Sequence, residues 1–190
     1  MAVEWSRPAV SLEPLRAGDL VWLARWERDD EVARLMGRRF ADAAEVDRWW
    51  MTLHRGAGRQ GFAIRLYGRL IGDVELEHIR RRTGEAEVRI CIGDRRCWGR
   101  GYGGEALRQL MAYAFGDLGL TRLYLRVAPD NLRAIRCYQR LGFQKRGRLK
   151  ATGRLLGQPE LILMDLARAL DEPSLAVRAS RAASLSTPAE

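Results

Sequence analysis

The sequence predicts a single α/β domain in which strands and helices alternate, and three observations predict it. The chain has 190 residues, of which 47% are hydrophobic, enough to bury one sizeable core. Patterns typical of strands and of helices follow one another along most of the chain. Between one predicted strand and the helix after it stand four glycines: Gly99, Gly101, Gly103 and Gly104.

Hydrophobic periodicity, together with turn and cap residues, sets the order of the elements. Tyr67, Gly68 and Arg69 form a probable hairpin turn, and Glu45 completes a capping box with Asp42 at a helix start. In order, the chain predicts a strand at 9–15, helical spacing over 17–37, a helix at 42–54, strands at 61–67, 69–79 and 86–93, a helix at 103–119, a strand at 120–129, a helix at 131–142, and strands at 143–150 and 159–170.

These elements define one domain with a tail at each end. We assign residues 1–8 to an N-terminal tail and 9–170 to the domain. Residues 171–190 are rich in Ala, Ser and Pro, and we expect a flexible C-terminal tail there.

The net charge of +9 comes from one part of the chain. Residues 61–150 hold nineteen Lys or Arg against nine acids, whereas the remainder is close to balanced. This excess suits a polyanionic ligand near the glycine cluster, and solvated arginine faces are the alternative. The basic run at residues 80–82 is too short for a nucleic-acid stripe, so nucleic acid is not a favoured partner.

The cysteines and the N-terminal residues indicate the cellular compartment. Three cysteines, Cys91, Cys97 and Cys137, fit neither a disulfide framework nor the spacing of a zinc site. No apolar run reaches the roughly 18 residues of a membrane span, and the start lacks signal-peptide features. We therefore expect a cytoplasmic protein with no membrane partner and no metal.

The glycine cluster precedes a predicted helix, and helix N-termini bind phosphate through unpaired amides and a partial positive charge. Glycines would let this backbone curl around a pyrophosphate, with Arg95, Arg96 and Arg100 adding attraction. A Gly-x-Gly alone is weak evidence. The dinucleotide fingerprint fails, because Tyr102 and Arg108 fall where it requires glycine, and the P-loop pattern is absent.

Two segments together resemble the GNAT superfamily of acyl-CoA-dependent N-acetyltransferases. The first is the loop R/Q-x-x-G-x-G/A, here "WGRGYG", which departs from the pattern because Trp98 replaces the usual Arg or Gln. The second is the run Asn-x-x-Ala-x-x-x-Tyr-x-x-x-Gly-Phe, here Asn131, Ala134, Tyr138, Gly142 and Phe143. "WGxGY" followed by "EA" resembles the branch of ribosomal-protein N-terminal acetyltransferases. The resemblance covers roughly residues 9–168.

The resemblance implies a mixed, mostly antiparallel sheet of six to seven strands flanked by about four helices. A splayed strand pair would hold acyl-CoA, with a bulge at Ile92 and Gly93 that frees backbone groups for pantetheine. A free amide there could polarise the thioester carbonyl. The residues implied to bind acetyl-CoA, as co-substrate, are Ile92, Gly93, Trp98, Gly99, Arg100, Gly101, Gly103, Gly104, Asn131 and Ala134.

For catalysis, the resemblance implies Tyr138 as the general acid that stabilises the departing sulfur. A packed helix aromatic is the alternative role for this residue. Glu87 matches the position of the general base, and the rivals on the neighbouring strand are Asp73, Glu75, Glu77 and His78. We expect Cys137 to be inert.

We expect the acceptor to contact the first two helices, where Trp22, Trp26 and Trp50 could form part of its pocket, although most tryptophans there would be core. The acidic run 29–31 could attract an amine, or be a solvated helix start. The expected reaction is acetyl transfer in a ternary complex. The acceptor stays open between a protein α-amine and a small amine such as a polyamine or aminoglycoside. The alternative function is a non-catalytic acyl-CoA sensor, and a homodimer is compatible with either.

Overall fold

A computed structural model describes residues 9–36, 42–55, 58–150 and 160–168. The predicted tails at 1–8 and 171–190 lie outside these residues. Within them, no helix is both long and apolar enough to cross a membrane.

The described residues form one seven-stranded sheet in the order β1-β2-β3-β4-β5-β7-β6. Every neighbouring pair is antiparallel except β4 with β5, which confirms the predicted mixed and mostly antiparallel sheet. The strands are β1 (Val10–Pro14), β2 (Gln60–Leu66), β3 (Arg69–Arg80), β4 (Glu85–Ile92), β5 (Arg122–Val127), β6 (Gln144–Lys150) and β7 (Glu160–Ala167).

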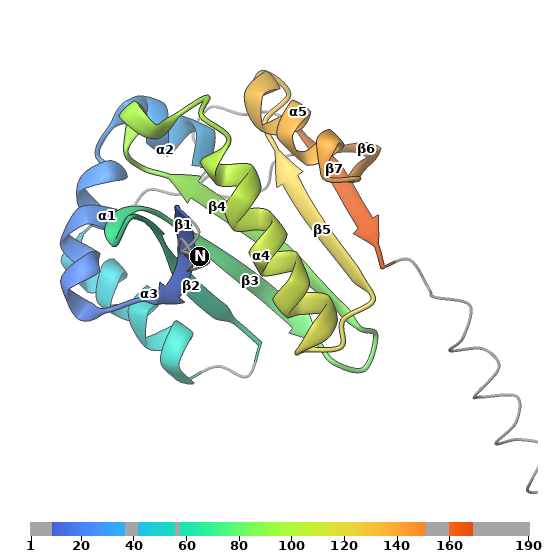
Figure 1. Ribbon diagram of the computed structural model, residues 1–190, viewed down its shortest axis with the longest axis horizontal. Helices are drawn as coiled ribbons and strands as arrows, with labels where there is room; N and C mark the ends of the chain where they lie inside the picture. The colour runs from blue at the N-terminus through green and yellow to red at the C-terminus, as the bar shows by residue number, and fades with distance from the viewer. Residues whose placement is uncertain (1–8, 37–41, 56–57, 151–159, 169–190) are drawn as a thin grey trace, which may run out of the picture.

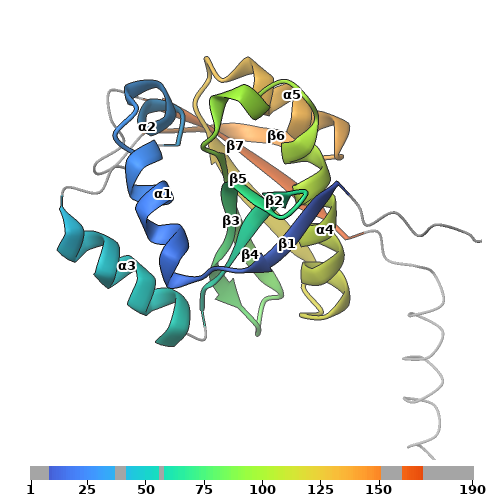
Figure 2. The ribbon, with the colours of Figure 1, turned by 60° about the vertical axis from the view of Figure 1, so that its left-hand side comes forward.

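Helices cover both faces of the sheet (Figures 1 and 2). The N-terminal helices α1, α2 and α3 lie on one face, and α4 and α5 lie on the other, as Figure 2 shows. The α-helices are α1 (Leu20–Trp26), α2 (Asp30–Met36), α3 (Ala43–Arg55), α4 (Tyr102–Gly116) and α5 (Leu132–Arg140), with 3-10 turns η1 (Ala17–Asp19) and η2 (Arg95–Cys97).

The predicted hairpin is present, with Tyr67 and Gly68 as its two turn residues. Both have positive φ, of 48° and 80°, which a tight two-residue hairpin requires and glycine adopts without strain. The predicted cap is present too, because the Asp42 side chain accepts a hydrogen bond from the Glu45 amide at 2.8 Å.

The helical spacing predicted over 17–37 is divided between two helices, α1 and α2. The chain breaks between α1 and α2, where the Asp29 side chain accepts hydrogen bonds from the amides of Glu31 and Val32. Glu27, between α1 and α2, is buried like the inward-facing residues of the two helices. The spacing of buried positions therefore does not reveal the break.

The bulge predicted at Ile92 and Gly93 is also absent from its expected place. The β3–β4 register runs regularly from Glu77 paired with Glu87 up to Gly72 paired with Ile92, where β4 ends. The irregularity in this pair lies at the other end, between Glu77 and Arg80.

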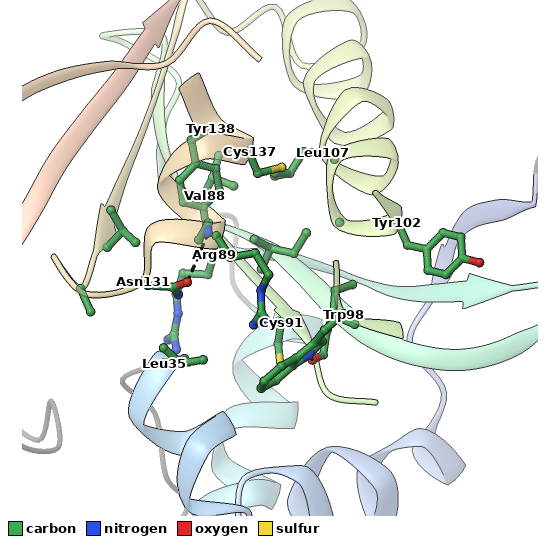
Figure 3. A pocket seen from close by; sticks show the side chains of 18 of the residues that line it. Leu35, Val88, Arg89, Cys91, Trp98, Tyr102, Leu107, Asn131, Cys137 and Tyr138 are labelled. Carbon is green, nitrogen blue, oxygen red and sulfur yellow. Dashed lines mark hydrogen bonds between the residues drawn. The ribbon is translucent and has the colours of Figure 1, made fainter. Parts of the chain in front are cut away.

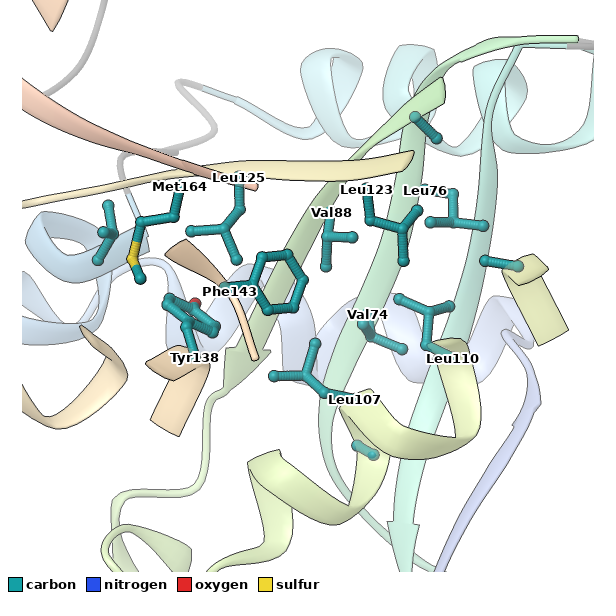
Figure 4. Close-up of a cluster of buried hydrophobic side chains, with 14 of the residues drawn as sticks. Val74, Leu76, Val88, Leu107, Leu110, Leu123, Leu125, Tyr138, Phe143 and Met164 are labelled. Atoms are coloured by element: carbon teal, nitrogen blue, oxygen red, sulfur yellow. The ribbon is translucent and has the colours of Figure 1, made fainter. Parts of the chain in front are cut away.

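Alternation of side chains places the main core between the sheet and α4 with α5. Val74 and Leu76 of β3 meet Leu107 and Leu110 of α4, and all four are essentially buried (Figure 4). The other face of β3 is polar although buried, with Asp73, Glu75 and Glu77. The sheet therefore presents an apolar side to α4 and a charged side to the N-terminal helices.

Strands β4 and β5 diverge, and this divergence creates the site. They pair only over three positions, from Glu85 with Arg122 to Glu87 with Tyr124. Beyond these positions β4 continues to Ile92 and β5 to Val127 without pairing to each other, and Figure 1 shows the two arrows separating.

Candidate active site

A cleft of about 440 Å³ opens where β4 and β5 separate (Figure 3). Its walls come from α2, β4, the loop before α4, the first turns of α4, the end of β5, and α5. The predicted site residues that line it are Glu87, Ile92, Trp98, Gly99, Gly101, Gly103, Gly104, Asn131, Ala134 and Tyr138.

The glycine loop (residues 98–104) forms one wall and delivers the N-terminus of α4, a helix of 15 residues. Gly99 and Gly101 have φ of 72° and 84°, which side-chain-bearing residues rarely adopt. A Cβ built on either would meet no atom within 4 Å, so space remains beside this backbone. The first-turn amides of α4 are available to an anion.

Trp98, the departure from the usual loop pattern, is a structural anchor of the glycine loop. Its Nε1 donates a hydrogen bond to the backbone carbonyl of Ile92, which ties the loop to the end of β4. The Arg133 guanidinium lies over the ring, 3.9 Å from its centroid. In Figure 3 the indole stands on the opposite side of the cleft from Tyr138.

Asp94 fixes the start of this loop. Its side chain accepts hydrogen bonds from the backbone and guanidinium of Arg96 and from Arg69. These bonds, with that to Arg96 foremost, lower the pKa of the Asp94 carboxyl well below its usual range. Arg95 pairs with Glu31 and Arg96 pairs with Asp94, so carboxylates partly offset the charge that these two arginines bring to the loop.

Asn131 lines the cleft as the N-cap of α5. Its side-chain oxygen accepts a hydrogen bond from the Ala134 amide at 3.2 Å. The signature residue thus orients the helix that carries Tyr138 two turns later.

Tyr138 lies in the cleft and is 9% exposed. Its ring packs against Phe143, with ring centroids 6.0 Å apart, so it also serves the core. Burial raises the pKa of the phenol, which keeps the hydroxyl protonated at neutral pH. A protonated phenol in a cleft can donate a proton.

Glu87 is the buried carboxylate at the base of the divergence, 3% exposed. Arg126 of β5 donates to both of its oxygens, at 2.7 and 2.9 Å, across the last paired position of the two strands. His78 Nδ1 lies 3.2 Å from Oε2. The carboxylate is therefore held in one orientation by groups from both neighbouring strands.

The four rivals for the base do not line the described cleft. Glu75 pairs with Arg59 at 2.8 Å, and Glu77 pairs with Arg59 and Arg89. His78 is largely exposed and reaches the cleft only through its contact with Glu87.

Five predicted site residues lie outside the lining: Gly93, Arg100, Trp22, Trp26 and Trp50. Gly93 has a different reason for being glycine, because a Cβ there would lie 2.1 Å from the Trp26 ring. Trp22 is 49% exposed, and Trp50 packs in the smaller core of α1 and α3. Their proposed contacts with coenzyme or acceptor remain predictions.

The lining also contains residues that sequence reasoning missed, most notably Arg126 and Arg133. Both belong to segments whose type was predicted, a strand and a helix. Which arginines face the cleft depends on how β4 and β5 diverge, and no local pattern encodes this. The proximity of Arg133 to Asn131 in the sequence was the one available signal.

Comparison with known proteins agrees with this geometry. A family model described as an acetyltransferase (GNAT) domain matches residues 10–144. An uncharacterized N-acetyltransferase p20 from Bacillus licheniformis is 31% identical over 157 residues, covering 77% of this chain and 88% of that protein. Spermidine N(1)-acetyltransferase from Escherichia coli K12 is 32% identical over 149 residues, covering 76% and 77%.

Among solved structures, the crystal structure of spermidine N-acetyltransferase from Vibrio cholerae in complex with CoA and spermine has a TM-score of 0.76 at 23% identity. It covers 84% of this chain and 95% of that one. The Escherichia coli and Vibrio cholerae relatives carry polyamine names, and none of these relatives is named for the ribosomal-protein branch that the loop resembles. With its diverging strands, its glycine loop and the matching family model, the chain belongs to the GNAT family of acetyltransferases.

Proposed function

We propose that the protein transfers the acetyl group of acetyl-CoA to a primary amine. One observation carries the proposal: the glycine loop, Asn131 and Tyr138 line a single cleft between diverging strands. Such a cleft offers amides for phosphate at one end and a phenol at the other.

The shape of the loop supports the coenzyme assignment. Space beside Gly99 and Gly101, and the open first turn of α4, fit a diphosphate approaching the backbone. The Vibrio cholerae relative was crystallised with CoA, and its fold matches this one closely. The unpaired inner edges of β4 and β5 would hydrogen-bond pantetheine as an added strand does.

Two side chains, Glu87 and Tyr138, supply the chemistry in this proposal. Glu87 takes the proton from the acceptor ammonium, directly or through water, and the neutral amine attacks the thioester carbonyl. As the carbon–sulfur bond breaks, Tyr138 gives its proton to the departing sulfur, and the proton that the new amide nitrogen loses returns to the Tyr138 oxygen. Burial raises the pKa of the Cys137 thiol in the same cleft, which disfavours an acyl-enzyme and favours direct attack.

How much proton removal Glu87 must perform depends on the pKa of the acceptor amine. An α-amine with a pKa of about 7.8 is roughly a quarter neutral near pH 7.4, whereas a lysine amine is only about 0.1% neutral. Arg126 already donates a hydrogen bond to each oxygen of Glu87, and an amine that is already partly neutral requires less proton transfer to this carboxylate.

The charge of the lining favours an acceptor with one amine over a polyamine. The described lining holds one carboxylate, Glu87, and these arginines: Arg34, Arg89, Arg126, Arg133 and Arg140. Arg34, Arg89 and Arg126 are paired with Asp130, Glu77 and Glu87. The excess positive charge therefore comes from Arg133 and Arg140, which repel a multiply charged cation more than a single one. We therefore infer a monoamine acceptor, either a small molecule or, as the loop "WGRGYGGEA" suggests, a peptide α-amine.

Release of free thiol from acetyl-CoA tests the function. We expect turnover with at least one member of a panel of short peptides, small monoamines, spermidine and an aminoglycoside, with spermidine below the best monoamine. Tight binding of acetyl-CoA without thiol release from any amine would favour a coenzyme sensor. Spermidine as the best substrate would refute the monoamine inference but not the transferase.

A further inference from the structure

Arg133 bridges the cleft from α5 to the glycine loop. It stands in the first turn of α5, and its guanidinium lies over the Trp98 ring at 3.9 Å from the centroid. The two residues are separated by more than thirty positions and come from opposite sides of the cleft. Their contact closes one end of it.

The platform under Arg133 is fixed. Trp98 Nε1 is bonded to the Ile92 carbonyl, and a second guanidinium, that of Arg95, lies 5.5 Å from the ring centroid. Arg95 is itself held by Asp29 and Glu31 at the start of α2. The indole therefore cannot turn without breaking contacts to two other elements.

The Arg133 guanidinium can bind an anion, whereas that of Arg95 is paired with Asp29 and Glu31. Within the described ranges, Arg133 makes no ion pair with a carboxylate, and Glu31 acts on it only at a distance. Partial burial lowers its pKa slightly from the usual arginine value, which leaves the group fully charged at neutral pH. A stacked guanidinium keeps its N–H groups pointing outward in its own plane.

We propose that Arg133, whose guanidinium lies over the Trp98 ring, binds a phosphate group of coenzyme A. This inference rests on the proposed function, because it requires the coenzyme in the cleft. The planar fork of arginine matches two phosphate oxygens at once. Coenzyme A offers two such groups. One is the diphosphate that the glycine loop would hold, and the other is the 3′-phosphate of the ribose.

Calorimetric affinity for CoA tests the assignment without requiring activity. We expect Arg133→Gln to weaken CoA about 10- to 100-fold, as the loss of a charge-assisted phosphate bond does. Arg136→Gln is the matched control, one turn along the same helix, exposed and outside the lining, and should change affinity less than about twofold. Arg133→Lys should recover only part of the loss, because lysine cannot stack as a fork.

Truncated ligands distinguish the two phosphates. If Arg133 binds the diphosphate, Arg133→Gln weakens CoA and 3′-dephospho-CoA equally. If it binds the 3′-phosphate, only CoA is weakened. S-acetylpantetheine lacks both phosphates and should bind wild type and Arg133→Gln alike.

The role of Trp98 as platform is tested by a double-mutant cycle. With Trp98→Leu in place, Arg133→Gln should cost CoA affinity less than it does in the wild type. Wild-type affinity in Arg133→Gln, or an equal loss for S-acetylpantetheine, would overturn the assignment while leaving the transferase proposal standing. A wild-type protein that does not bind CoA at all would overturn both.

Discussion

Tyr138 combines two roles that are often treated as alternatives. Its ring packs with Phe143 in the core, while the residue lines the cleft. Because burial raises the pKa of the phenol, the hydroxyl stays protonated at physiological pH and can donate a hydrogen bond to the sulfur as it departs. The packing fixes the direction in which that donor points.

Removing the hydroxyl while keeping the ring separates the two roles. Tyr138→Phe should lower kcat about 10²-fold through loss of the general acid, with little change in melting temperature. Tyr113→Phe is the control, since Tyr113 bonds Gln60 outside the cleft. The steady-state rate of thiol release gives kcat for each variant. A near-normal kcat in Tyr138→Phe would leave Tyr138 with a packing role alone.

Glu87 differs from its neighbour Glu77 in what it faces. Both are buried and paired with arginine, but only Glu87 lines the described cleft. We expect Glu87→Gln to lower kcat/KM by about 10-fold or more, and Glu77→Gln to lower stability without a comparable loss of rate. Equal losses of kcat/KM in the two variants would show that Glu87 acts through structure only.

At the scale of elements, the junction between β4 and α4 determines the site. The first turn of α4 lies close to β4, and a Cβ on Gly103 would sit 3.6 Å from the Ile92 side chain. Small residues here keep the space in which the coenzyme would lie.

Filling that space should block the coenzyme. Acetyl-CoA should raise the melting temperature of the wild type, and Gly103→Trp should abolish this shift. Gly116→Trp places the same side chain at the open far end of α4 and should leave the shift intact. Thermal unfolding with and without ligand gives the answer, and an undiminished shift in Gly103→Trp would contradict the location of the site.

The turn η2 gives a pH dependence with a defined sign. Because Arg96 and Arg69 lower the pKa of Asp94 in the folded state, its contribution to stability is present above the unfolded value of about 3.9 and is lost as pH falls below it. The difference in unfolding free energy between wild type and Asp94→Asn should be constant from about pH 5 to 8 and shrink below about pH 4. Urea denaturation from pH 8 down to pH 2 measures it, and a gap of unchanged size between pH 5 and pH 2 would argue against ion pairing as its origin.

At the scale of the molecule, local patterns predicted the helices and strands, and with the family motifs they predicted part of the cleft lining. The glycine loop, Asn131 and Tyr138 were predicted from the resemblance to the GNAT motifs, and the structure places the loop before α4 and Asn131 as the cap of α5. The break before α2 was missed, since Asp29 caps a helix without interrupting the hydrophobic period.

Long-range packing explains the remaining differences. Trp26 was expected in the acceptor pocket, yet its ring covers Gly93, a neighbour set by the approach of α1 to the end of β4. Arg126 and Arg133 were missed because their positions depend on strand divergence. Likewise, the pairing of Arg95 with Glu31 could not be predicted, because only the folded chain brings the start of α2 close to η2.

A crystal structure of the protein with CoA tests the central claim most directly. The account predicts diphosphate oxygens within hydrogen-bond distance of backbone amides between Gly99 and Gly104, and the sulfur beside the Tyr138 hydroxyl. Coenzyme bound elsewhere, or a thiol remote from Tyr138, would contradict it.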